Sequence, residues 1–164
     1  MFDTDRDIEK VSDIKSVNDA LCLWVIHADK IPPHIGISFK GLFYSLKANG
    51  KDEGVPNDSL VQVLNNKKIK TLVYVLAESP QLDLAKIYKK YSSTLPGSVT
   101  CLHPIKEILS IPHADKIHDI IDVLSSQGSI HKCLGLNVGD GFGGIQEYDL
   151  AAIHERLLKL KENG

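Results

Sequence analysis

Residues 34–46 contain the feature that most restricts how this chain can fold. Two alternating runs of polar and apolar residues, 34–39 and 42–46, are separated only by Lys40 and Gly41. Strands joined by two residues pair antiparallel, and glycine supplies the positive φ that such a turn requires. The sequence therefore predicts a tight β-hairpin and, with it, an antiparallel sheet.

Other apolar patterns predict further strands beside this hairpin. Residues 21–26 and 71–76 are continuous apolar runs, which are typical of buried strands. Residues 130–136 fit an edge strand, whereas residues 49–56 are polar, contain glycine and fit a loop. The sheet predicted from these runs is small.

Helical spacing of apolar residues accounts for much of the remaining chain. A short amphipathic surface helix is expected within residues 1–19. Five more helices are predicted at 57–64, at 80–91, from near Cys101 to 109, at 113–125 and at 148–161. The fold class is therefore α+β, with a small antiparallel sheet packed against several helices.

The length and composition fit one globular domain. The chain has 164 residues, of which 43% are hydrophobic and 24% are charged. Because no internal repeat or linker divides it, we expect a single domain over residues 1–164. Within it we distinguish an N-terminal segment (1–19), a core (21–110) and a C-terminal helical extension (111–164).

Charge and hydropathy restrict the partners. Nineteen basic and twenty-one acidic residues give a net charge of −2, which supplies no electrostatic reason to bind nucleic acid. No run reaches the roughly 18 apolar residues of a transmembrane helix, and the acidic N-terminus does not resemble a signal peptide. We expect a cytoplasmic protein without a nucleic-acid partner; its oligomeric state stays open.

The three cysteines, Cys22, Cys101 and Cys133, lie far apart. Their odd number and wide spacing argue against a disulfide framework and indicate a reducing compartment. Cys22 and Cys133 fall within predicted strands and fit packing roles. Cys101 lies near the start of a predicted helix, where the helix dipole favours the thiolate, so it is our candidate nucleophile. The alternative is that Cys101 is a small buried hydrophobic residue.

The histidines near Cys101 do not have the spacing of a metal site. His113 and His118 are five residues apart, whereas helical zinc motifs place two histidines four apart. Cys101 and His103 could supply two ligands, but no second pair of possible ligands accompanies them in the sequence. We therefore predict neither a metal nor another cofactor.

The combination of His34 and Cys101 resembles the circularly permuted papain-like cysteine hydrolases, which include the NlpC-type amidases and their lecithin:retinol acyltransferase-like relatives. The resemblance rests on His34-Ile35-Gly36-Ile37, on the turn at Gly41 and on Thr100-Cys101-Leu102-His103. It covers residues 21–110, which it implies form a papain-like core.

The resemblance also implies roles for three residues. Cys101 falls on the family's nucleophile and His34 on its base. The third, orienting residue comes from the returning strand, where Ser45 is the first candidate and Tyr44 and Lys47 are less suitable ones.

We therefore expect a cysteine hydrolase or acyltransferase that acts on an amide or ester, with chemistry like that of a thiol protease. The acyl group would pass from Cys101 to water or another acceptor. The substrate would be a small acyl compound, a peptide or a lipid. The alternative is a catalytically inactive module on the same fold that binds a protein partner or another ligand.

Overall fold

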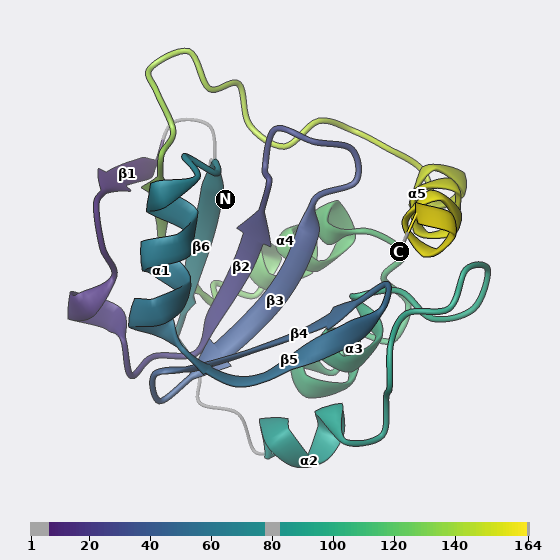
Figure 1. Ribbon diagram of the computed structural model, residues 1–164. Helices are drawn as coiled ribbons and strands as arrows, with labels where there is room; N and C mark the ends of the chain where they lie inside the picture. The colour runs from purple at the N-terminus through teal and green to yellow at the C-terminus, as the bar shows by residue number, and fades with distance from the viewer. Residues whose placement is uncertain (1–6, 78–82, 164) are drawn as a thin grey trace.

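Within residues 7–77 and 83–163, which the computed structural model describes, seven strands form one sheet in the order β1-β7-β6-β2-β3-β4-β5 (Figure 1). Only β1 and β7 pair in parallel, and all other neighbours are antiparallel. The strands are β1 (Ile8–Val11), β2 (Cys22–Ile26), β3 (His34–Phe39), β4 (Leu42–Lys47), β5 (Gly50–Pro56), β6 (Thr71–Leu76) and β7 (Ile130–Leu136). The predicted α+β class is confirmed, but the sheet is larger than the small one expected.

Strands β3 and β4 form the predicted hairpin. Lys40 and Gly41 have φ values of 51° and 82°, so both residues of the turn are left-handed, as this two-residue connection requires. A Cβ atom at Gly41 would lie 2.8 Å from Asn18 Nδ2, which is too close for an unshifted contact. The turn therefore needs glycine at position 41 for two reasons: the positive φ and the close approach of the Asn18 side chain.

Both faces of the sheet are covered. Successive side chains of a strand point to opposite faces; in β2, Leu23 and Val25 join one hydrophobic cluster, whereas Trp24 joins the other. The helix α1 (Asn57–Asn66) packs on the Trp24 face, and Figure 1 shows α1 in front of the sheet and α4 behind it. The opposite cluster includes residues of α2 (Leu84–Tyr88), α3 (His103–Leu109), α4 (Ile117–Ser126) and α5 (Leu150–Asn163). Burial on both faces explains why β2 and β6 are continuous apolar runs.

The predicted N-terminal surface helix is wrong for the described residues. Strand β1 and a short 3-10 helix, η1 (Lys15–Val17), stand in its place, while residues 1–6 lie outside the described part. Ile8 and Val11 are three residues apart, which in a strand places them on opposite faces. Each packs against a different hydrophobic cluster. The spacing that suggested a helix thus belongs to a strand that packs one half-buried apolar residue against each cluster.

Strand β7 is not the predicted edge strand, because β1 pairs with its outer side. The loop predicted at residues 49–56 is also wrong, since Gly50–Pro56 form β5 at the other edge of the sheet. An edge strand tolerates exposed polar and charged side chains, and those residues gave this segment its loop-like composition. Strand β5 places Asp52 opposite Ser45 of β4.

The helices agree with the predictions except at some ends. α3 begins at His103 with Pro104 in its first turn, and α1 and α5 lie where they were expected. α4 begins at Ile117, later than the predicted residue 113, and α2 begins at Leu84 after an N-cap from Asp83; residues 80–82 lie outside the described part. None of the helices in the described ranges has the length and apolar character needed to cross a membrane.

Candidate functional site

A line of hydrogen bonds crosses three neighbouring strands at His34. Nε2 of His34 lies 3.0 Å from Oγ of Ser45, and the Ser45 hydroxyl donates to Oδ2 of Asp52 at 2.9 Å. The strand register produces this line, because Ser45 pairs with Gly36 on one side and with Asp52 on the other. His34 and Gly36 are two residues apart and so face the same side of the sheet. We call His34, Ser45 and Asp52 the relay.

The directions of these hydrogen bonds define the tautomer of His34. A serine hydroxyl has one hydrogen, and that of Ser45 goes to Asp52. Ser45 Oγ must therefore accept a hydrogen bond from His34, so Nε2 carries the hydrogen and Nδ1 keeps the lone pair. Nζ of Lys47 lies 3.0 Å from Oδ1 of Asp52 and holds its second oxygen. The relay thus leaves His34 Nδ1 able to accept a proton.

Cys101 lies in a tight turn immediately before α3. The backbone N–H of Thr100 donates to Nδ1 of His103 at 2.9 Å, and Leu102 N–H donates to the Thr100 hydroxyl at 3.2 Å. Because Leu102 is the N-cap, Cys101 stands one residue outside the helix. A hydrogen bond from the backbone of Ile35 reaches the Cys101 sulfur. The thiol therefore lies against the beginning of β3, at Ile35, which is the residue that follows His34.

His34 and Cys101 line the same cavity, whose volume is about 1160 Å³. This volume exceeds the roughly 300–1,000 Å³ of typical small-molecule pockets. The cavity is bounded by the β2–β3 loop, α1, the start of β3 and α5. Asp52 reaches its wall, whereas Ser45 is fully buried behind it. Cys101 packs against the cluster on the Tyr44 face, whereas His34 and Ser45 point to the other face, so the thiol and the imidazole border the cavity from opposite faces of the sheet. Ser45 reaches the cavity only through His34.

Burial favours the neutral forms of both groups. It raises the pKa of the Cys101 thiol to about 11, against the opposing effect of hydrogen bonds from the backbone of Ile35 and from Cys101 itself. It lowers the pKa of His34 to about 4, although Asp52 opposes this change. The expectation of a stabilised Cys101 thiolate is therefore wrong for the resting protein. At pH 7 the site holds a neutral thiol and a neutral imidazole.

The other cysteines and the alternative orienting residues lie elsewhere or have other contacts. Cys22 and Cys133 are buried, and burial raises the pKa of each thiol to about 12, which agrees with the predicted packing roles. The ring of Tyr44 stacks on Tyr88 with centroids 5.5 Å apart, on the opposite face from Ser45. Lys47 contacts Asp52. Of the three candidates, Ser45 is the one that bonds His34.

Asp52 is the site residue that sequence reasoning missed. It was assigned to a loop, so nothing related it to Ser45. Extending the hairpin by a third antiparallel strand would have been the signal, since the short connection around Asn49 brings residues 50–56 back along β4.

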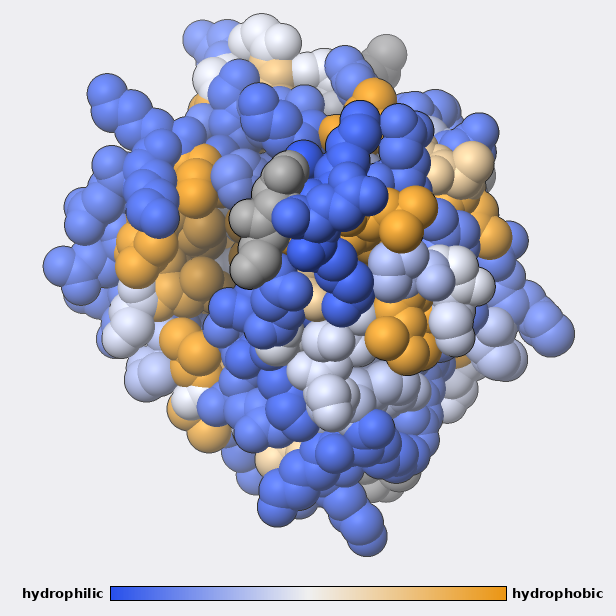
Figure 2. All heavy atoms as spheres, turned by 45° about the vertical axis from the view of Figure 1, so that its right-hand side comes forward, coloured by the Kyte–Doolittle hydropathy of each residue, from blue (hydrophilic) through white to orange (hydrophobic). Residues whose placement is uncertain are grey.

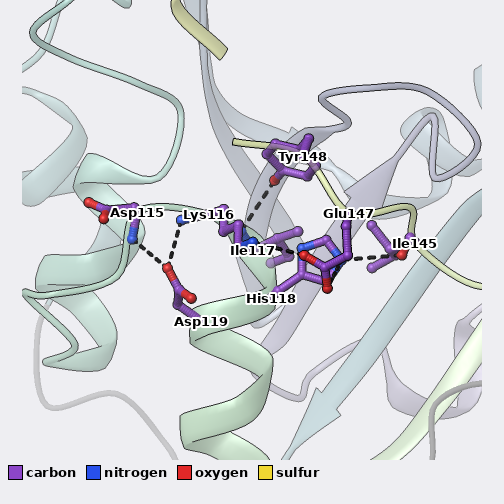
Figure 3. Close-up of polar contacts among 8 residues, drawn as sticks. All are labelled: Asp115, Lys116, Ile117, His118, Asp119, Ile145, Glu147 and Tyr148. Atoms are coloured by element: carbon purple, nitrogen blue, oxygen red, sulfur yellow. Dashed lines mark hydrogen bonds and ion pairs between the residues drawn. The ribbon is translucent and has the colours of Figure 1, made fainter. Parts of the chain in front are cut away.

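His118 and its neighbours join the start of α4 to the segment before α5. Figure 3 shows His118 at the start of α4 facing the segment before α5, with Nε2 3.2 Å from the Ile145 carbonyl oxygen. The Tyr148 hydroxyl accepts the N–H of Ile117 at 3.3 Å, and Lys116 pairs with Glu147 at 2.8 Å. These contacts fix Tyr148, which lines the cavity, and so position α5. No three metal-ligating side chains of residues 7–77 and 83–163 lie together as a metal site.

Comparisons of the chain with models of known protein families, with curated proteins and with solved structures found no match. A functional assignment for this protein therefore depends on the residues of the cavity and the relay.

Proposed function

We propose that this chain is a cysteine hydrolase or acyltransferase that acts on an amide or ester through Cys101 and His34. The observation that carries the proposal is the relay, which ends in an imidazole on the wall of the cavity that Cys101 also lines. A nucleophile, a histidine and a group that orients the histidine are the parts that acyl transfer requires. The proposed fold family is the permuted papain-like one, supported by a hairpin that carries His34 and Ser45 and a helix that follows Cys101.

The tautomer of His34 gives it the role of general base. Nδ1 takes the proton of the Cys101 thiol while the sulfur attacks the acyl carbon, so a C–S bond forms and the carbonyl oxygen becomes an oxyanion. The imidazolium then donates this proton to the leaving nitrogen or oxygen, and the bond between that atom and the acyl carbon breaks. Water or another acceptor later releases the acyl group in the same way.

One group beside His34 and two backbone amides beside the sulfur suit the charges that develop. The negative charge of Asp52 favours the imidazolium, and Ser45 transmits this effect without contacting substrate. The backbone amides of Cys101 and Ile35, which hydrogen-bond the sulfur, are the donors available to the oxyanion. Because the thiol and imidazole begin neutral, the proton moves during the attack and no resting ion pair is needed.

A second candidate function is ligand binding without catalysis. The observation that favours it is the burial that raises the pKa of Cys101 to about 11 and lowers that of His34 to about 4, since both shifts oppose an ion pair. In this case the large cavity would hold its ligand, and Cys101 would only pack against it.

Trapping of an acyl-enzyme distinguishes the two functions. Incubation with p-nitrophenyl octanoate, followed by intact mass spectrometry and peptide mapping, should show an octanoyl group on Cys101. The adduct should be absent in Cys101→Ser and should form at least about tenfold more slowly in His34→Gln, which removes the base. Unmodified Cys101, or equal rates in wild type and His34→Gln, would favour the binding module.

A further inference from the structure

The helix α5 buries little apolar surface for its length. Of its side chains at 150–162, which the structure describes, Ile153 and Leu157 are the two that are buried. Leu150 and Leu158 remain 42% and 52% exposed. By comparison, α4 has ten residues against the fourteen of α5 and buries four of them. Since buried apolar area is what mainly holds a helix against its neighbours, α5 is held less firmly than α4.

The segment before α5 ends in an anchor. Residues 137–149 form no helix or strand, and a connection of about a dozen such residues is uncommon and often functional. Near its end Tyr148 is buried. Its hydroxyl accepts the N–H of Ile117, and its ring packs edge-on against His118 with centroids 5.5 Å apart (Figure 3). The chain is therefore fixed to α4 immediately before α5 begins.

Beyond this anchor, two short hydrogen bonds join α5 to the loops beside it. Nδ1 of His154 accepts the backbone N–H of Gly97 at 2.8 Å. Nζ of Lys161 donates to the carbonyl oxygen of Ala48 at 2.6 Å. Each bond contributes only modestly to stability, because water can replace it when the helix moves away. We call these two hydrogen bonds the latch.

α5 closes the cavity on the face of the sheet where Cys101 packs. Tyr148, Ile153 and Leu157 line the cavity and belong to the cluster against which Cys101 packs. Cys101 also lies near enough to Tyr148 for its charge to raise the pKa of the phenol. The three lining residues are at most 9% exposed, so their packing leaves no open chamber on this face. A ligand therefore cannot pack against the thiol from this face while α5 stays in place.

The outer side of α5 faces solvent. Ala151, Glu155 and Glu162 follow one side of the helix and are exposed. Figure 2, which brings this side of the molecule forward, shows a mainly hydrophilic surface with hydrophobic side chains in separate groups. Movement of α5 away from the sheet therefore leads into water.

We infer that α5 is a lid over Cys101, which pivots at Tyr148 when the latch breaks. In the open state the thiol can be reached while the sheet, α1 and α4 stay folded. Such local opening costs less free energy than global unfolding and is common among elements that cover ligand sites. The inference does not rest on the proposed function, because a lid would serve a binding module as well as an enzyme.

Alkylation by iodoacetamide, followed by peptide mass spectrometry, measures the opening. Cys101 reports movement of the lid, and Cys133, which is fully buried in β7, reports global unfolding. The double variant His154→Leu, Lys161→Met removes the latch. It should raise the rate for Cys101 about tenfold, because the closed state loses two hydrogen bonds that the open state lacks. The rate for Cys133 should rise as well, since the unfolded chain also lacks the latch.

Val61→Ala is the matched control. Val61 is a buried residue of α1 in the cluster on the other face of the sheet, so its truncation destabilises the folded chain without changing α5. Cys133 should then react faster, whereas Cys101 should keep its wild-type rate. Equal acceleration of both thiols would mean that Cys101 is reached only by global unfolding. An unchanged rate for Cys101 in the latch variant would mean that α5 does not cover it. Either result would overturn the lid.

The outcomes separate the lid from the proposed function. Every comparison concerns the same thiol with His34 present, so the effect of His34 on the rate cancels. Failure of p-nitrophenyl octanoate to acylate Cys101 would contradict the enzyme and leave the lid. Failure of the latch variant would contradict the lid and leave the enzyme.

Hydrogen exchange provides a second test that does not use the thiol. A helix of fourteen residues is marginally stable by itself, so α5 should lose amide protection when it leaves the sheet. Peptides from α5 should therefore exchange faster than peptides from β2 and β6, and faster still in the latch variant. Equal protection of α5 and β2 in the wild type would overturn the lid.

Discussion

Ser45 Oγ lies 3.0 Å from Nε2 of His34. The register of β3 and β4 brings these two residues together across the predicted hairpin, and the second hydrogen bond of Ser45, to Asp52, requires the His34 hydrogen to be on Nε2. The register of three consecutive strands therefore determines which nitrogen of His34 carries the hydrogen.

Ser45→Ala should slow acylation of Cys101 by about 10- to 100-fold, because His34 loses the group that fixes its orientation and tautomer. The free energy of unfolding should fall by about 1–3 kcal/mol, because buried polar groups lose a partner. Ser38→Ala is the matched control: Ser38 is also fully buried in the hairpin, and it accepts the indole N–H of Trp24 at 2.8 Å. An equal loss of acylation in both variants would contradict the relay.

Asp52→Asn should lower the pKa of His34 further, since the negative charge of Asp52 opposes the effect of burial. NMR titration of the imidazole measures this change, and acylation should slow with it. Glu53→Gln removes the neighbouring charge, which pairs with Lys51 on the same strand, and should leave the titration of His34 unchanged. An unaltered pKa of His34 in Asp52→Asn would show that the carboxylate does not act on the imidazole.

The free energy of unfolding should depend on His34 at mildly acidic pH. The pKa of His34 is about 4 in the folded protein, whereas the ordinary pKa of histidine, which applies to the unfolded chain, is 6.5. Between these two pH values the unfolded chain therefore binds one proton at His34 that the folded protein does not bind. Stability should therefore fall as the pH drops from 6.5 to 4, by about 3 kcal/mol for this group. His34→Gln should reduce that slope, measured by urea denaturation at each pH. A slope that stays the same in His34→Gln would contradict the effect of burial on His34.

Gly36→Ala should destabilise the hairpin at the position that pairs with Ser45. An added Cβ atom would lie 2.3 Å from Cζ of Phe43 and 2.9 Å from the Tyr44 carbonyl oxygen. We expect a loss of about 1–3 kcal/mol on unfolding, as for other overpacked cores. Gly139→Ala, where no atom lies within 4 Å of the new Cβ, should unfold like the wild type. A Gly36→Ala protein as stable as the wild type would contradict the packing of Phe43 beneath β3.

The sequence was most informative where structure is local. The turn at Lys40 and Gly41 predicted the hairpin, and the hairpin brought His34 to Ser45. Strand β1 was missed because its partner, β7, lies more than a hundred residues away, so Ile8 and Val11 show no local sign of pairing. Asp52 was missed because an edge strand contains the same polar residues as a loop.

The protonation state of Cys101 was also beyond the sequence. Its position near a helix start favours the thiolate, but the residues that remove water from the thiol come from several separate elements. Burial outweighs the local effect. Only the folded arrangement shows that Cys101 and His34 both begin neutral.

Alkylation of Cys101 by iodoacetamide tests the central claim most directly, namely that His34 acts as the base for this thiol. Peptide mass spectrometry should measure the rates for Cys101, Cys22 and Cys133 in wild type and in His34→Gln. At pH 7.5 Cys101 should react faster than the other two, because it alone among the three lines the cavity. His34→Gln should slow it at least about tenfold, and the difference should narrow toward pH 10 as the thiolate forms without a base. Equal rates for Cys101 in the two proteins at pH 7.5 would contradict the account.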